Sequence, residues 1–400
     1  MNNKRRVLLF DDETATRLAW KRRLESLEGF SDEFTIESTD AGELSAILQG
    51  LRLRQARART SDDEDNGNLL DTVDLLIVDF DLFAGDNRHE ATGEEVAYLA
   101  RCYSTCGFII GVNQFGENVF DLTLRGHPDS FADLNIGSAQ LANPGLWSYA
   151  WNSFRPWHWP LLTEAVDSFH RRASDILGSL DEKIVDFLGV PLDIKEIVPR
   201  SALEFIGTDQ AANETSFREF VSDSGKGVRT KDRVNEPAYI ARIAAARVGK
   251  WLERLVLPGQ NILIDAPHLL ERFPSLGRLS QTSSAADWPA GSDLLFPSPQ
   301  VLDLEKIKRH SFERKDWLSR AAWFWPALGD LPDIDEVSDP WSRVSVDLAF
   351  CEDLSRFRPL AEVKGFVAEV ESPFIQRYVL GPGHSETTDV SYRPSVRFAL

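Results

Sequence analysis

The stretch Leu75-Leu76-Ile77-Val78-Asp79-Phe80-Asp81-Leu82 places four apolar residues directly before a segment with two carboxylates. A short, continuous apolar run that ends in polar residues is typical of a strand buried in a parallel sheet. In an open α/β sheet, ligands bind outside the carboxyl ends of the strands. We therefore expect Asp79 to face a functional site.

An earlier segment repeats this design. Arg6-Val7-Leu8-Leu9-Phe10 is followed at once by Asp11-Asp12-Glu13. Two neighbouring strands that each carry carboxylates at their carboxyl ends form an acidic pocket. Such a pocket suits a hard divalent cation with oxygen ligands, typically Mg²⁺ with several retained waters. The sequence therefore predicts a magnesium site between these two strands.

These segments resemble the receiver domain of bacterial response regulators, in which paired acids follow the first strand and a single Asp follows the third. The resemblance lies within residues 1–178. It implies that a histidine kinase or phosphotransfer protein phosphorylates Asp79, that Asp12 ligates Mg²⁺ directly and that Asp11 does so largely through water. It also implies that the backbone carbonyl of Asp81 is a further metal ligand.

Two later positions depart from the receiver pattern. Receivers carry Ser or Thr at the end of the fourth strand, whereas Asn113 stands there. An Asn amide can donate a hydrogen bond to a phosphoryl oxygen, but its carbonyl oxygen repels one. The receiver Lys that precedes a Pro at the fifth strand has no counterpart near Asn135. Either Arg155, which precedes Pro156, replaces it after an insertion and contacts the phosphate, or the cation is absent.

Alternating strand and helix patterns predict an α/β domain with a doubly wound, parallel five-stranded sheet of the receiver or flavodoxin-like kind. The expected strands are 7–10, 34–38, 75–78, 107–114 and 130–136. The expected helices are 14–28, one that starts at Ala41, one that opens at Thr92, and one from Trp159 or Pro160 to Leu177. The helix from Ala41 extends into a charged run, which we interpret as a solvated insertion around residues 52–70, with a partner-docking arm as the alternative.

Beyond residue 178 the alternation of strands and helices stops. We expect a second domain, residues 179–400, that is an α+β unit, mainly helical with a β-rich end. Its expected helices are 201–205, 215–221, 238–255 and 312–325, and its expected strands lie within 344–350 and 366–370. No family resemblance covers this half.

The composition excludes several classes of protein. The chain has 63 acidic and 44 basic residues, and this formal charge of −19 argues against a nucleic-acid-binding protein, which needs clustered Lys and Arg. The 11 Trp and 24 Phe residues can fill real cores, so the chain is not wholly disordered. No apolar run reaches the ~20 residues that cross a bilayer. Residues 1–6 lead directly into a strand without a signal peptide, so we expect a cytoplasmic protein that does not enter the membrane.

Two clusters of reactive side chains are weaker signals. Cys102 and Cys106 share a predicted helix face, but no second Cys or His pair follows at zinc-site spacing, so we interpret them as buried thiols. Cys351-Glu352-Asp353 places carboxylates after a predicted strand and near Lys364, a combination also found in metal-dependent nucleases. Their spacing fits no tight pattern, so we interpret them as surface charge.

These features predict a signalling protein in which Mg²⁺-dependent phosphorylation of Asp79 controls a C-terminal domain that binds a partner protein. The alternative is a pseudo-receiver scaffold that binds partners without phosphorylation. A second alternative is a receiver-regulated enzyme whose activity lies in residues 179–400. The sequence leaves enzymatic activity open and favours a protein without it, because no tight catalytic motif appears.

Overall fold

The computed structural model describes most of the chain. The described residues are 4–37, 39–60, 67–82, 91–113, 130–148, 157, 159–196, 198, 200–207, 213–222, 236–277, 302–329, 331, 334, 348–367 and 376–381. The predicted phosphate-contacting residue Arg155 lies outside them, so that prediction stays as made. Within these ranges, every helix is too short or too polar to cross a membrane.

Five strands form one sheet in the order β2-β1-β3-β4-β5, and all of its neighbouring pairs are parallel. The strands are β1 (Arg5–Phe10), β2 (Phe34–Ile36), β3 (Leu75–Asp79), β4 (Phe108–Asn113) and β5 (Leu134–Gly137). This order is one of the two common orders of doubly wound α/β sheets. The prediction of a five-stranded parallel α/β sheet is confirmed.

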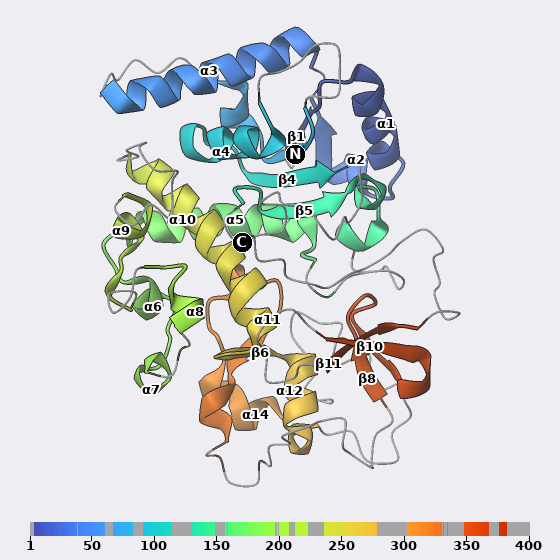
Figure 1. Ribbon diagram of the computed structural model, residues 1–400, viewed down its shortest axis with the longest axis vertical. Helices are drawn as coiled ribbons and strands as arrows, with labels where there is room; N and C mark the ends of the chain where they lie inside the picture. Colours follow the sequence, from blue (N-terminus) through green and yellow to red (C-terminus); the bar gives the residue numbers. More distant parts are fainter. Residues whose placement is uncertain are drawn as a thin grey trace.

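Helices cover this sheet because its central strands are apolar on both faces. They are α1 (Thr14–Glu25), α2 (Phe30–Glu33), α3 (Ala41–Thr60), α4 (Gly93–Tyr103) and α5 (Leu162–Leu177). Every residue of β3 and β4 is buried, as expected for strands between two helical layers. Figure 1 shows α3 and α4 on one side of the sheet and α5 on the other. The expected extension of the helix from Ala41 is confirmed, since α3 has 20 residues.

The start of α4 lies directly against the end of β3. Thr92 caps the helix, because its hydroxyl accepts a hydrogen bond of 3.1 Å from the backbone N–H of Glu95. A Cβ atom at Gly93 would lie 2.2 Å from the carbonyl oxygen of Asp79. Only glycine therefore allows this helix to begin so close to the backbone of Asp79.

The C-terminal half is built from short elements around one long helix. Its helices are α6 (Ile184–Phe187), α7 (Leu192–Lys195), α8 (Arg200–Leu203), α9 (Phe217–Ser222), α10 (Pro237–Trp251), α11 (Leu257–Gly259), α12 (Ala266–Arg272) and α14 (Leu304–Ile307). Its strands are β6 (Leu263–Asp265), β7 (Ala322–Phe324), β8 (Leu348–Cys351), β9 (Arg356–Pro359), β10 (Val363–Val367) and β11 (Gln376–Leu380). They form a two-stranded sheet, β6-β7, and a four-stranded sheet in the order β10-β11-β8-β9.

Single helical turns complete the described structure. The 3₁₀ turns are η1 (Leu69–Thr72), η2 (Ser138–Gln140), η3 (Pro144–Leu146), η6 (Pro274–Leu276), η7 (Lys308–His310), η8 (Lys315–Trp317), η9 (Trp325–Leu328) and η11 (Leu360–Glu362). The π-helical turn η5 (Leu252–Val256) directly follows α10, so the long helix predicted over 238–255 is confirmed in its main part.

The helix predicted over 312–325 is wrong. This segment contains the turn η8, the strand β7 and the first residue of the turn η9, and no α-helix. β7 pairs antiparallel with β6, with Phe324 opposite Leu263 and Trp323 opposite Ile264. Pairing with a strand that lies far away in the sequence overrides the local helical pattern here.

α10 closes the end of the large sheet at which β4 and β5 begin. It packs against α4, α5 and α9. Arg242 donates hydrogen bonds to the backbone carbonyls of Thr105 and Cys106, just before β4. Lys250 donates one of 2.7 Å to the carbonyl of Ala132, just before β5. The two cysteines predicted to be buried thiols, Cys102 and Cys106, are free and buried.

Candidate functional site

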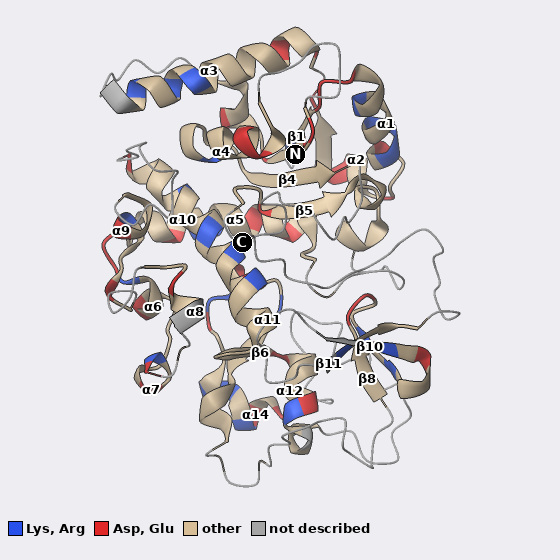
Figure 2. Cartoon of the chain, viewed as in Figure 1, with Lys and Arg blue, Asp and Glu red and all other residues tan. Residues whose placement is uncertain are grey.

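Polar side chains follow three neighbouring strands at one edge of the large sheet. Asp11 and Asp12 come directly after β1, Asp79 is the last residue of β3, and Asn113 is the last residue of β4. The parallel register of these strands brings their carboxyl ends together. Figure 2 shows the acidic residues in the connection between β1 and α1. The structure thus gathers four of the predicted site residues at the expected edge.

These side chains are withdrawn from solvent. The exposed fraction is 0% for Asp11, 1% for Asp79, 8% for Asp12 and 9% for Asn113. Asp81, the fifth predicted residue, is partly exposed. Carboxylates are seldom buried without a cation or several hydrogen bonds, because burial disfavours their charged form.

One carboxylate oxygen each of Asp11 and Asp12 accepts no hydrogen bond from the described residues. Oδ1 of Asp11 accepts a hydrogen bond of 2.7 Å from the backbone N–H of Glu13. Oδ2 of Asp11 and Oδ2 of Asp12 are buried and have no hydrogen-bond partner among the described residues. Two buried carboxylate oxygens without donors are the kind of ligand that a hard cation prefers.

The raised pKa of Asp11 agrees with this lack of hydrogen-bond donors. Burial raises the pKa of Asp11 to about 6, and the nearby charges of Asp12 and Glu13 add to the increase, whereas the N–H of Glu13 and the charge of Arg17 oppose it. Arg17 is buried at this site. Its guanidinium donates to the backbone carbonyl of Asp11 and to the hydroxyl of Thr14. The described hydrogen bonds of Arg17 therefore go to acceptors other than the carboxylates of Asp11 and Asp12.

The residues of this pocket fit a bound metal ion in part. The unused oxygens of Asp11 and Asp12 match the chemistry of Mg²⁺, and a cation there would offset the cost of ionising Asp11. However, no three His, Cys, Asp or Glu side chains within the described ranges are arranged to hold a metal ion. Mg²⁺ at Asp11, Asp12, Asp79 and Asp81 therefore stays a prediction.

A second set of buried charged groups lies in the C-terminal half, and the sequence did not reveal it. Nδ1 of His268 is 2.6 Å from Oδ1 of Asp265, and the indole N–H of Trp157 donates to Oδ2 of Asp265 at 2.5 Å. A guanidinium nitrogen of Arg320 is 3.6 Å from the same oxygen. The side chains of Asp265 and His268 are 1% and 4% exposed.

Glu352 extends this set, and its interpretation as surface charge is wrong. It is buried, forms an ion pair with Arg377, and has one carboxylate oxygen 3.8 Å from Nε2 of His268. Residues on α12, β11 and the end of β8 thus meet in one cluster, the Asp265–His268–Glu352 cluster. The sequence carries one local signal for this cluster. Asp265 precedes a helix that has Pro267 in its first turn, and this pattern is typical of an N-cap residue.

The charges of Asp265 and His268 compensate each other, whereas burial raises the pKa of the neighbouring Glu271 to about 7. Burial alone raises the pKa of Asp265, but the charge and hydrogen bond of His268, with Arg320 and Trp157, lower it to about 2. Burial alone lowers the pKa of His268, but the charge and hydrogen bond of Asp265 raise it to about 9. We therefore interpret the cluster as a structural ion-pair network.

Comparisons with known proteins add no family to this picture. No protein-family model matches the chain, and a search of curated proteins finds no match either.

Proposed function

We propose that the N-terminal α/β unit is a divergent receiver module that accepts a phosphoryl group on Asp79 with the help of Mg²⁺. The observation that carries the proposal is the pair of unsatisfied, buried oxygens on Asp11 and Asp12, next to the strand that ends in Asp79. The strand order β2-β1-β3-β4-β5 supports it, since this order is shared by flavodoxin-like folds.

The proposed reaction is a direct phosphoryl transfer. A carboxylate oxygen of Asp79 attacks the phosphorus of the donor, a P–O bond to Asp79 forms, and the bond between phosphorus and the leaving group breaks. The leaving group is the histidine of a kinase or phosphotransfer protein, or acetate when acetyl phosphate is the donor. Mg²⁺ would neutralise charge on the phosphoryl oxygens. Asp11 and Asp12 would hold that ion, with the backbone carbonyl of Asp81.

Asn113 would face the transferred group from the next strand. Its amide N–H₂ can donate to a phosphoryl oxygen, although it lacks the small hydroxyl of a Ser or Thr. β4 runs from Asn113 to Phe108, beside the loop held by Arg242 of α10. We propose this strand as the route by which the acidic site influences a partner protein bound to the C-terminal half.

One observation favours the alternative, a pseudo-receiver that never carries phosphate. From β5 to Ser148 the described chain contains no Lys or Arg that could meet a phosphoryl group. In that case the acidic pocket would bind partners or a cation without chemistry, and the module would act as a scaffold.

The decisive experiment is incubation of the full chain with acetyl phosphate and Mg²⁺, followed by intact-mass and peptide mass spectrometry. We expect one added phosphoryl group on Asp79, none without Mg²⁺ and none in Asp79→Asn. Asp81→Asn is the matched control, because its proposed ligand is the backbone carbonyl, which the substitution leaves in place. Labelling of Asp79→Asn to the same extent would disprove the assignment. Absence of labelling in the parent chain would favour the scaffold.

A further inference from the structure

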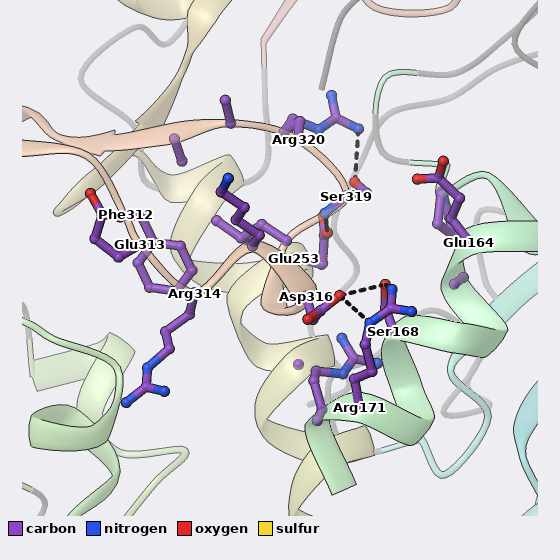
Figure 3. Close-up of a pocket in the computed structure, with 18 of the residues that line it drawn as sticks. Glu164, Ser168, Arg171, Glu253, Phe312, Glu313, Arg314, Asp316, Ser319 and Arg320 are labelled. Carbon is purple, nitrogen blue, oxygen red and sulfur yellow. Dashed lines mark hydrogen bonds and ion pairs between the residues drawn. The ribbon is translucent and has the colours of Figure 1, made fainter. Parts of the chain in front are cut away.

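A cavity of about 560 Å³ lies at the end of the sheet opposite Asp79. It is bounded by α5, α10 and the segment from Leu304 to Trp323, and it touches Phe108 at the start of β4. Figure 3 shows side chains from these elements around it. Five residue steps separate Phe108 from Asn113 along β4, which corresponds to about 16 Å. The volume suits a small organic molecule.

Arg172, on the α5 wall of this cavity, is a buried basic side chain without an ion pair among the described residues. Its exposed fraction is 8%. Among the described residues its Nε has no hydrogen-bond partner. Burial lowers the pKa of Arg172, and the more distant charges of Asp133, Glu253 and Asp316 oppose this shift. Its charged end lies 5.9 Å from the ring centre of Trp317. A Cβ at Gly249 would lie 2.6 Å from Nη1 of Arg172, so α10 leaves room for this guanidinium.

Three of the acidic side chains that line the cavity hydrogen-bond or pair with groups other than Arg172. Asp316 accepts a hydrogen bond of 2.7 Å from Arg171, and Asp133 pairs with Arg101. Glu253 accepts a hydrogen bond from the backbone N–H of Ser319. The charges of Asp133, Glu253 and Asp316 favour the charged form of Arg172 from a distance, but none of these three carboxylates hydrogen-bonds its guanidinium, which can therefore bind an anion in the cavity.

A second basic side chain lines the cavity from α10, and burial lowers its pKa to about 7. Lys250 lines the cavity, is buried, and donates to backbone carbonyls of the loop before β5. The apolar side chains of Phe312, Leu318 and Trp323 also line the cavity. The lining therefore combines basic and apolar side chains.

We propose that this cavity binds a small molecule through a carboxylate or phosphoryl group that pairs with Arg172, with an apolar body against Phe312, Leu318 and Trp323. A guanidinium can hold either oxyanion with two parallel hydrogen bonds. Such a ligand would contact α5, α10 and the segment before β7 at once. The site does not depend on phosphorylation of Asp79.

The test is isothermal titration calorimetry of the full chain with three probes that share one ring system: 1-naphthyl phosphate, 1-naphthoate and uncharged 1-naphthol. We expect at least one anion to bind about tenfold or more tightly than 1-naphthol, a difference of about 1.4 kcal/mol. The anion that binds identifies the preferred group as phosphate or carboxylate. Equal binding of 1-naphthol, or no binding of either anion, would overturn the proposal.

Variants separate recognition by Arg172 from general effects. Arg172→Met should lose the preference for the anion and keep the affinity for 1-naphthol. It should also raise the melting temperature of the ligand-free chain, because an unpaired buried charge is removed. Arg218→Gln is the matched control, since Arg218 pairs with Asp181 and does not line the cavity, and it should keep the preference. Retention of the preference in Arg172→Met would contradict the proposal.

A second variant keeps the test valid if Arg172→Met does not fold. Ala165 lies on α5 and lines the cavity. Ala165→Phe should fill part of the volume and weaken the binding of all three probes. Unchanged binding in this variant would show that the probes bind elsewhere and would overturn the proposal.

Discussion

The acidic pocket after β1 and β3 and the Asp265–His268–Glu352 cluster are both buried, but the pKa of Asp11 in the first is raised and the pKa of Asp265 in the second is lowered. In the acidic pocket, burial raises the pKa of Asp11 to about 6, and one oxygen each of Asp11 and Asp12 has no described partner. In the C-terminal cluster, His268 and Arg320 lower the pKa of Asp265 to about 2.

This difference in pKa distinguishes Asp265, which stabilises the fold, from Asp11, which is suited to bind a ligand. A compensated ion pair contributes to the folded state and has little left to offer a ligand. An uncompensated carboxylate opposes folding when ionised, and such perturbed groups concentrate at functional sites. The electrostatic state of each acid, rather than its burial, indicates its role.

The largest expected effect comes from breaking the compensated cluster. Asp265→Asn leaves His268 without its counter-charge, which should lower the free energy of unfolding at pH 6 by about 3–5 kcal/mol. Urea denaturation measures this change. Asp316→Asn is the control, because its pair with Arg171 is partly exposed and should contribute about 0–1 kcal/mol.

The pH dependence of the parent chain tests the same pair. Because the folded-state pKa of His268 is raised from 6.5 to about 9, its contribution is complete below pH 6.5 and is lost as the pH rises through 9. The contribution of Asp265 is complete above pH 3.8 and is lost as the pH falls toward 2. A small effect of Asp265→Asn throughout this range would show that the cluster is not compensated.

The second largest effect is an increase in stability, expected for Asp11→Asn. The folded-state pKa of Asp11 is raised from 3.8 to about 6, so the folded chain holds this proton more strongly and loses stability as the pH rises from about 4 to 6. Asp11→Asn should therefore be more stable than the parent at pH 7 by about 2–3 kcal/mol, and no more stable near pH 4. Thermal unfolding at both pH values checks this.

An exposed acid provides the control for that experiment. Asp32→Asn changes the same charge on the surface of α2 and should leave stability nearly unchanged at both pH values. If Asp11→Asn destabilised the chain at pH 7, the acidic pocket would be compensated by groups outside the described residues, and the contrast between the two clusters would fail.

The smallest effect concerns Arg17, the cation buried beside the acidic pocket. Its hydrogen bonds go to a backbone carbonyl and a hydroxyl. Arg17→Met should therefore raise the pKa of Asp11 by less than one unit, or less than about 1.4 kcal/mol. Carbon-13 NMR titration of the Asp11 carboxyl group measures this, with Arg17→Lys as the charge-preserving control. A rise of several units would mean that Arg17 already neutralises the pocket.

Local patterns were sufficient for the central sheet and for the acidic edge. The run that ends in Asp79 predicted β3, and the acids after β1 were placed correctly beside it. The same reasoning failed for 312–325, where a helical pattern forms a strand paired with β6. It also failed for Glu352, which an Arg from another strand neutralises in the interior.

The sequence by itself determined which segments are strands and helices in the N-terminal half, because each buried strand shows its own apolar run. Tertiary structure alone decided which charges are neutralised. His268, Glu352 and Arg377 meet from three distant segments. Within the described ranges Arg172 forms no ion pair, and its neighbours Asp133 and Asp316 bind other arginines. Electrostatic energy depends on the distance between charges and on their burial, and the local sequence determines neither of these.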